Sequence, residues 1–193
     1  MQPLTRADLM PLETYAVERP AFRARVLAHK RARRLSLGAH ATLLFEDRLT
    51  VQYQVQEMLR IERIFEPAGI QAELDAYNLL VPGGGDLRAT LLIEYPDAAQ
   101  RRDALAALGG IEHGVFAEVD GLGRATTHAD EDLPRSTDAR TAAVHFLRCA
   151  FTADAIAALR AGAGLAFGID DARMPLRVDT TPALRAALLR DFD

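Results

Sequence analysis

The chain has 193 residues and a net charge of −4, and about half of its residues are apolar. This length fits one domain, and the composition is typical of a globular protein, not of a disordered one. Its single cysteine, Cys149, excludes an internal disulfide and any zinc or iron–sulfur site built from several cysteines of the chain. With no signal peptide and no apolar run of about 18 residues, the sequence predicts a cytoplasmic protein that does not enter a membrane.

The charge is unevenly distributed. Residues 1–40 hold eight Lys or Arg and three Asp or Glu, a net charge of +5, whereas residues 41–193 carry −9. Most of the positive charge lies in a predicted helix over 19–34, which Pro20 would start. Its basic patch consists of Arg23, Lys30, Arg31, Arg33 and Arg34. The basic side of this helix is exposed to solvent, binds an acidic protein partner, or binds nucleic acid. The net negative charge of the protein and the lack of aromatic residues among the arginines argue against nucleic acid.

The longest helical pattern covers residues 47–66. Apolar residues fall on two sides of this central helix, which is typical of a buried helix, and Pro67 would end it. Glu62 and Glu66 project near the centre of its broad apolar arc, where a carboxylate needs an arginine, a hydrogen-bond donor or a metal. The sequence therefore predicts either an Arg–Glu network or a ligand or metal site that uses Glu57, Glu62 or Glu66.

Several polar side chains of the central helix lie near one side and are expected to line a cleft with residues 75–78. This candidate binding patch consists of Tyr53, Gln56, Glu57, Arg60 and Glu62. No metal motif accompanies it, because Glu-x-x-His pairs are absent and no two histidines have a metal-binding spacing. The sequence thus predicts no cofactor and assigns no metal ligands, although it leaves a bound metal open.

The C-terminal half follows a glycine-rich linker that begins at Pro82. Strand patterns cover 87–95, 115–119, 124–128, 142–151 and 165–169; helix patterns cover 96–108, 153–161 and 181–188; a polar loop covers 130–138. The order strand–helix–strand occurs twice, which resembles a ferredoxin-like split β-α-β arrangement. The predicted fold class is α+β, with a helical N-terminal region over 1–82 packed on a mainly antiparallel sheet from 86–193, together forming one compact domain.

Two further patterns do not support catalysis. Gly162, Gly164 and Gly168 follow a predicted helix and enter a strand, the reverse of a dinucleotide-binding motif, so we predict that they end the helix and let a neighbouring segment approach the sheet. His145 and Cys149 share a strand face about 13 Å apart, too far for a nucleophilic pair. Both are predicted to be core residues.

Four long segments carry a resemblance to a known family. ATLLFEDRLTVQYQVQEMLRIERIFE, ELDAYNLLVP, the opening LTRADLMPLETYA and the later TAAVHFLRCAF resemble the bacterial family of unknown function DUF3501. The resemblance covers nearly all of residues 4–170. It implies a redox or oxidative-stress setting, because genes of this family often lie beside those for rubrerythrin and a cysteine-rich iron–sulfur oxidoreductase. It supplies no catalytic residues.

Together these patterns favour a non-enzymatic accessory or interaction protein. Its expected partner is a redox protein such as rubrerythrin or the iron–sulfur oxidoreductase, and this association comes from the resemblance alone. One alternative is a metal- or small-ligand-binding protein, including an enzyme, that uses the polar residues of the central helix. A weaker alternative is a nucleic-acid-binding regulator that uses the basic helix 19–34. The sequence leaves a homo-oligomer open.

Overall fold

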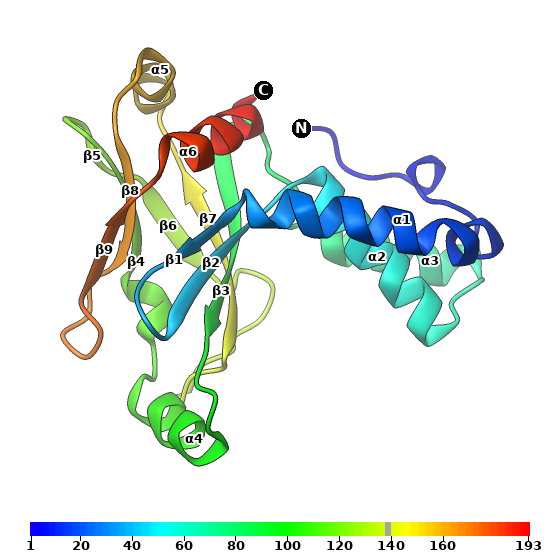
Figure 1. Cartoon of the computed structure of the whole chain (residues 1–193), viewed down its shortest axis with the longest axis horizontal. Coiled ribbons are helices and arrows are strands. Elements are labelled where there is room, and N and C mark those ends of the chain that lie inside the picture. Colours follow the sequence, from blue (N-terminus) through cyan, green and yellow to red (C-terminus); the bar gives the residue numbers. More distant parts are fainter. Residues whose placement is uncertain (138–139) are drawn as a thin grey trace.

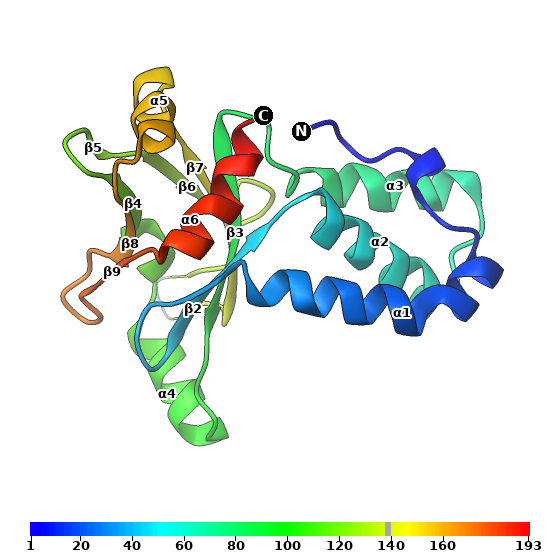
Figure 2. The same ribbon diagram turned by 45° about the horizontal axis from the view of Figure 1, so that its top comes forward.

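The computed structural model describes residues 1–137 and 140–193 and has two parts, an arm of three helices and a body of two β-sheets (Figures 1 and 2). The first sheet has the strand order β1-β2-β3-β7-β6 and the second β5-β4-β8-β9, with every pair antiparallel. The strands are β1 (Arg34–Ser36), β2 (Ala41–Glu46), β3 (Asp86–Ile93), β4 (Val115–Val119), β5 (Gly123–Arg124), β6 (Thr126–Ala129), β7 (Val144–Ala150), β8 (Leu165–Ile169) and β9 (Leu176–Asp179). The predicted α+β class with antiparallel sheets is confirmed.

The main core lies between the two sheets. Strand side chains alternate between faces, so Leu87, Ala89 and Leu91 of β3 all point to the same side and are buried. Across the core, the rings of Phe45 and Phe167 from opposite sheets lie 4.8 Å apart. The other face of the first sheet carries polar residues and is turned toward the arm.

The body helices begin where their sequence predicts. The side chains of Asp97, Thr152 and Thr181 accept hydrogen bonds from backbone N–H groups in the first turns of α4 (Ala98–Ala107), α5 (Ala153–Ala161) and α6 (Pro182–Leu188). Both predicted strand–helix–strand units are present. Each unit spans the two sheets, however, because β4 and β8 pair with each other and not with β3 or β7.

The sequence analysis missed β9, a short edge strand that pairs with β8. Only four residues long, it provides too little alternation to distinguish a strand from a loop. The glycine expectation is nonetheless met at Gly168, where a Cβ atom would overlap the Leu176 carbonyl oxygen and the Phe116 ring. Its lack of a side chain lets β9 approach the sheet.

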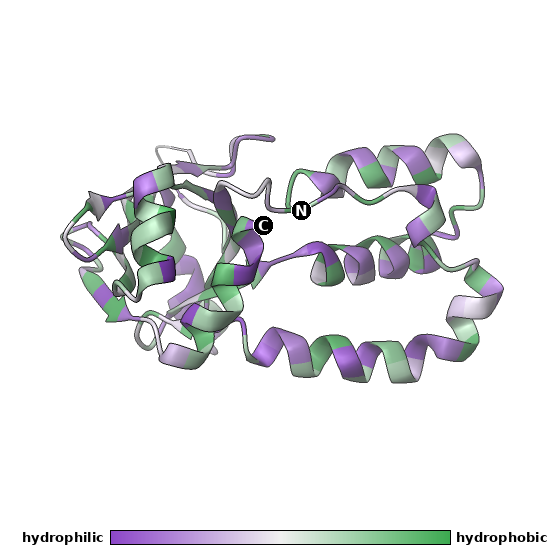
Figure 3. Cartoon of the chain, turned by 90° about the horizontal axis from the view of Figure 1, so that it is seen from above, coloured by the Kyte–Doolittle hydropathy of each residue, from purple (hydrophilic) through white to green (hydrophobic). Residues whose placement is uncertain are grey.

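The arm consists of α1 (Leu12–Arg31), α2 (Arg48–Glu62) and α3 (Pro67–Asn78), and polar and apolar residues are interleaved along all three helices (Figure 3). The prediction that Pro20 starts a helix over 19–34 was wrong, since Pro20 lies inside α1. Proline lacks the N–H that would bond the Ala16 carbonyl, but both residues are exposed, where water can replace that bond. Two segments of the N-terminal region, 34–36 and 41–46, are strands of the first sheet.

The predicted central helix over 47–66 is shorter at its C-terminal end. Asp47 caps it, and its side chain accepts from the N–H groups of Leu49 and Thr50 at 3.1 and 3.0 Å. At the other end Arg63 takes a left-handed conformation, with φ of 56°, which ends α2 four residues before Pro67. Glu62 and Glu66 are therefore exposed, and the expectation that they are buried carboxylates was wrong.

Short 3-10 turns complete the chain. They are η1 (Arg6–Asp8), η2 (Ile111–Gly114) and η3 (Leu189–Phe192). Thr5 and Asp8 form a capping box around η1. Asp138, the last residue of the expected polar loop, lies outside the described residues. Among the described residues, no helix combines the length and apolarity needed to cross a bilayer.

One buried arginine joins the end of α1 to β2 and to the C-terminal helices of the body. Arg33 follows α1, and its side chain is 2% exposed. Its guanidinium donates to the carbonyl oxygens of Phe45, Glu46 and Ala187 at 3.0, 3.2 and 3.2 Å, and to the carboxylate of Asp191. Burial raises the pKa of Asp191 to about 6 although Arg33 lowers it, so this carboxyl is ionised at neutral pH and pairs with the arginine.

We expect Arg33→Met to lower the free energy of unfolding by about 3–5 kcal/mol, because it leaves a buried carboxylate and three carbonyl oxygens without their donor. Urea denaturation at neutral pH measures this loss. Arg23→Met, which changes an exposed arginine of α1, is the control and should shift stability by less than about 0.5 kcal/mol. Equal effects of the two variants would contradict a central role for Arg33.

Candidate functional site

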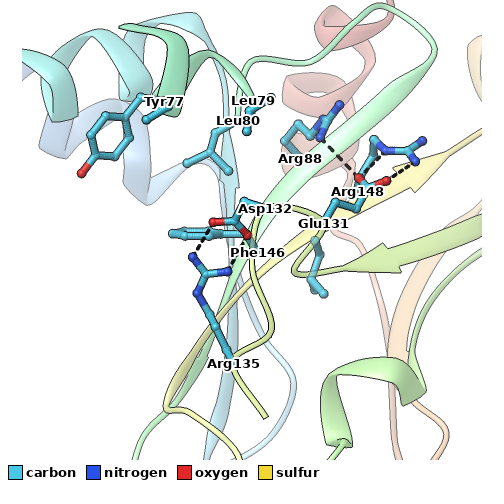
Figure 4. A pocket seen from close by; sticks show the side chains of 11 residues that line it. Tyr77, Leu79, Leu80, Arg88, Glu131, Asp132, Arg135, Phe146 and Arg148 are labelled. Atoms are coloured by element: carbon cyan, nitrogen blue, oxygen red, sulfur yellow. Dashed lines mark hydrogen bonds and ion pairs between the residues drawn. The ribbon is translucent and has the colours of Figure 1, made fainter. Parts of the chain in front are cut away.

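A cleft with both polar and apolar walls lies where the arm meets the outer face of the first sheet. It has a volume of about 490 Å³, within the range of small-molecule sites (Figure 4). Its apolar wall comes from the end of α3 and the residues just after it, including Tyr77, Leu79 and Leu80. Its polar wall comes from the sheet and from the segment after β6: Arg88, Glu131, Asp132, Arg135, Phe146 and Arg148.

Strand alternation places the sheet residues of this cleft. Arg88 on β3 lies opposite Arg148 on β7, and Thr90 lies opposite Phe146 two residues further along. Because their neighbours in sequence point into the core, these four side chains all face outward, toward α3. Two arginines directly opposite each other repel, so acidic residues must lie close to both.

Glu131 and Asp132 supply that negative charge. Arg148 donates to both carboxylate oxygens of Glu131 at 2.7 and 2.6 Å, and Arg135 donates to both oxygens of Asp132 at 2.6 Å. These bidentate hydrogen bonds lower the pKa of both carboxyls below their ordinary values, although partial burial opposes the shift. Arg135 also lies over the Phe146 ring, 4.5 Å from its centroid, which fixes one end of the cleft.

Arg88 is paired less completely than the other two arginines. Its Nη1 is 3.8 Å from Glu131 Oε2, too far for a hydrogen bond. Its Nε lies 2.8 Å from Asp86 Oδ2, but the geometry is not that of a hydrogen bond, and this buried nitrogen has no hydrogen-bond partner. The charge of Arg88 is thus compensated, while part of its donor capacity is unused.

A smaller hollow of about 230 Å³ continues from the cleft. It shares Tyr77, Leu80 and Phe146 with it and is also lined by Lys30, Leu44, Glu46, Val51, Gln54 and Thr90. The Thr90 hydroxyl donates to Glu46 Oε1 at 2.9 Å, which holds that buried carboxylate on the sheet. The two hollows together present an apolar strip along α3 and a charged strip along the sheet.

Comparison with known proteins places the chain in a family. The family model described as "Protein of unknown function (DUF3501)" matches residues 3–192. The chain belongs to the DUF3501 family. It is also similar to a crystal structure of a novel protein of unknown function from Burkholderia pseudomallei K96243, with 50% sequence identity, full coverage of both chains and a TM-score of 0.94. No curated protein sequence matches the chain. The resemblance seen in the sequence is therefore confirmed, and the function of the family is uncharacterised.

The predicted binding patch holds this DUF3501 protein's arm together. Glu57 accepts from the Tyr15 hydroxyl at 2.7 Å and from Arg19 Nε and Nη2 at 2.7 and 2.8 Å. Arg60 lies further from the same carboxylate, at 3.4 Å. Glu57 therefore contacts α1, and Arg60 contacts Glu57, so the expected Arg–Glu network exists at Glu57.

The remaining patch residues are not gathered around a cavity. Gln56 is fully buried and accepts from the Met10 N–H at 2.5 Å, whereas Tyr53 packs on Phe22 with ring centroids 6.0 Å apart. Glu62 is exposed at the end of α2. The smaller hollow brings Tyr77 together with Val51 and Gln54 of α2, and none of the five patch residues lines it.

The basic patch is also dispersed. Arg23 and Arg31 are exposed on α1, and Lys30 lines the smaller hollow. Arg33 is buried, and Arg34 on β1 pairs with Glu94 at 3.6 Å. Because the helix ends at Arg31, the last two arginines leave its surface, so the five residues do not form one exposed face.

Sequence reasoning missed the cleft because its residues are far apart in the chain. Arg88 and Arg148 are separated by 60 positions and meet only through the pairing of β3 with β7. One local signal was present: charged residues at alternate positions of two strands whose other positions are apolar mark an outward face. That signal identifies a solvated face but not the element that covers it.

We expect Glu57→Gln to lower the free energy of unfolding by about 1–3 kcal/mol at pH 7, because it weakens hydrogen bonds from two buried or partly buried donors. Arg19, the largest cause, holds the folded pKa of Glu57 at about 2, below its ordinary value of 4.5. The contribution of this carboxylate is therefore present above pH 4.5 and is lost as the pH falls toward 2.

Urea denaturation of both proteins at pH 7, 5 and 3 tests this dependence. Glu62→Gln, an exposed glutamate on the same helix, is the matched control and should cost less than about 0.5 kcal/mol at any pH. A difference between wild type and Glu57→Gln that does not shrink at pH 3 would contradict the assigned ion pair.

Proposed function

We propose that this protein binds a small molecule that has an apolar part and an acidic group, in the cleft between α3 and the first sheet. The observation that supports it is the Arg88 guanidinium, whose Nη1 lies too far from Glu131 for a hydrogen bond, on the floor of a cleft whose opposite wall is apolar. This is the small-ligand function that the sequence left open, now assigned to a different set of residues.

The shape and lining of the cleft support a ligand of mixed polarity. Tyr77, Leu79 and Leu80 give a surface against which an apolar group loses contact with water, worth about 25 cal/mol for each Å² buried. Leu79 is 54% exposed, so this surface is open to an incoming molecule. A purely apolar ligand would leave the sheet wall unpaired, because its charged groups would lose water without gaining a partner.

The hydrogen-bond donors of the arginines favour an acidic group on that ligand, although Asp86 balances the charge of Arg88. Three arginines line the cleft against two carboxylates, and both carboxylates are engaged by Arg148 and Arg135. A carboxylate, sulfonate or phosphate beside Arg88 would accept a hydrogen bond from its Nη1, which lies 3.8 Å from Glu131 Oε2, beyond hydrogen-bond distance. Charge-assisted hydrogen bonds of this kind contribute about 1.5–3 kcal/mol each.

Fluorescence titration with two matched probes tests the proposal. Anilinonaphthalene sulfonate carries the aromatic part and an acidic group, whereas N-phenyl-naphthylamine carries the aromatic part alone. We expect the sulfonate to bind more tightly, and Arg88→Gln to weaken it by about 10-fold to 100-fold while changing the neutral probe little. Arg124→Gln is the control, since Arg124 also lies over a phenylalanine, 4.0 Å from the Phe116 centroid, but on the other sheet. Equal binding of the sulfonate to wild type and Arg88→Gln would contradict the proposal.

A second proposal concerns the protein partner expected from the family resemblance, in a redox or oxidative-stress setting. The last turn of α2 and the segment before α3 expose two large apolar side chains, Ile61 at 60% and Phe65 at 64%. Exposed apolar residues at the end of a projecting arm support a protein contact there (Figure 2). Nothing in this contact requires the cleft to be empty or filled.

Calorimetric titration with purified rubrerythrin and with the iron–sulfur oxidoreductase, both from the same bacterium, tests this contact. We expect one of them to bind, and Phe65→Ser to weaken binding by about 10-fold or more, because a buried aromatic anchor contributes more than about 1.4 kcal/mol. Leu122→Ser removes a comparably exposed apolar side chain, 52% exposed, from the body and should have no effect. Absence of binding by both proteins would contradict the proposal.

A further inference from the structure

A second group of chemically active side chains is buried inside the body, away from the open part of the cleft. Glu112 of η2, Asp130 after β6 and His145 of β7 bring one ligand atom each within 4.8 Å of one another. Their side chains are 2%, 5% and 0% exposed. Burying two carboxylates beside one histidine costs free energy unless positive charge or hydrogen bonds compensate, so the surroundings of this cluster require an explanation.

The orientation of His145 is fixed by Asp130. The histidine Nδ1 lies 2.6 Å from Asp130 Oδ2, and the other oxygen of Asp130 accepts from the Phe146 N–H at 2.9 Å. A carboxylate bound to one ring nitrogen sets the direction of the other, the arrangement found behind histidines that ligate metals. In this protein it turns Nε2 toward Glu112.

Three oxygen atoms surround His145 Nε2. Thr141 Oγ1 is 2.7 Å away, the carbonyl oxygen of Ala142 is 3.0 Å away, and Glu112 Oε2 is 3.9 Å away. Ligands of one ion with bonds of about 2.0–2.2 Å lie about 3–3.5 Å apart, so small side-chain shifts would bring these four atoms to a common centre. One nitrogen and three oxygens suit a divalent transition-metal ion such as Zn²⁺ or Mn²⁺.

Positive side chains near the cluster are mostly engaged elsewhere. Arg135 Nη1 lies 3.1 Å from Asp130 Oδ1, but the same guanidinium binds both oxygens of Asp132. His113 is 3.6 Å from the outer oxygen of Glu112, and its side chain is 71% exposed. Among the described residues, the Glu112 oxygen that faces His145 is within hydrogen-bond distance of the Thr141 hydroxyl, at 3.3 Å, and no arginine is paired with it.

We propose that Glu112 and His145 bind a divalent transition-metal ion, with Thr141 and the Ala142 carbonyl completing the site and Asp130 orienting the histidine. Thr141 and Ala142 also line a hollow of about 490 Å³ beside α4, so two of the proposed ligand residues border open space. Neither the sequence motifs nor the family description assigns these residues a function. The site is separate from the ligand cleft and does not depend on it.

Calorimetry with Zn²⁺ on the full chain, after treatment with a chelator and its removal, tests the site, with the visible absorption of bound Co²⁺ as a second readout. We expect one ion per chain. Glu112→Gln should weaken Zn²⁺ binding by more than about 100-fold, because it removes a direct ligand. Asp130→Asn, which removes only the carboxylate that orients His145, should weaken metal affinity by about 10-fold to 100-fold. Glutamine keeps the volume of Glu112 and can still accept from Thr141, so this variant is expected to fold.

His113→Gln is the matched control, since it removes the exposed histidine that lies beside the same glutamate. Its affinity for Zn²⁺ should equal that of the wild type. Loss of binding in His113→Gln would place the ion on the surface and overturn the proposal, as would equal binding by Glu112→Gln and wild type. Failure of the wild type to bind Zn²⁺ or Co²⁺ would leave the cluster as a hydrogen-bond network and also overturn it. If His145→Gln does not fold, Glu112→Gln still decides between these outcomes.

Discussion

The structure depends on one buried guanidinium. Arg33 lies where α1 ends and β1 begins, and it reaches the backbone of β2, the end of α6 and the carboxylate of Asp191 in η3. Three segments from opposite ends of the chain therefore share one set of donors. A lysine could not replace it, because only the planar guanidinium offers enough N–H groups in directions that match several carbonyl oxygens at once.

Fixing this junction also fixes where the arm lies. With α1 held at the C-terminal helix and α2 capped by Asp47 directly after β2, the C-terminal end of α3 lies beside the outer face of the first sheet. That face carries Arg88, Thr90, Phe146 and Arg148, because strand alternation has already used the other face for the core. The cleft is thus a consequence of covering a charged sheet face with a helix end that is mainly apolar.

Polar side chains serve different roles in the arm and in the body. Glu57 and Gln56 lie between helices, where their hydrogen bonds join α2 to α1 and to the chain before it. His145 faces the core from β7, and its neighbours on the strand, Val144 and Phe146, face outward. Cys149 shares the inward face, and burial raises the pKa of its thiol to about 11, which keeps it unreactive at neutral pH.

Local sequence determined much of the fold. The caps at Asp97, Thr152 and Thr181, the alternation of β3 and β8, and the capping box at Thr5 all follow from interactions within a few residues. Such signals predicted the helices of the C-terminal half, its strands other than β9, and the α+β class. They failed where one backbone angle decided the outcome, as at Arg63, and where α1 continued through Pro20.

Tertiary structure alone decided the candidate sites. The residues of the cleft meet through pairing of β3 with β7 and the position of α3, and Glu112 reaches His145 across 33 positions. Sequence spacing cannot reveal such contacts, because they depend on strand register and on which element covers each sheet face. The sequence shows that Arg33 belongs to a basic segment and that His145 has apolar neighbours on its strand. Only the packed chain shows that Arg33 joins the arm to the body and that His145 faces a buried glutamate.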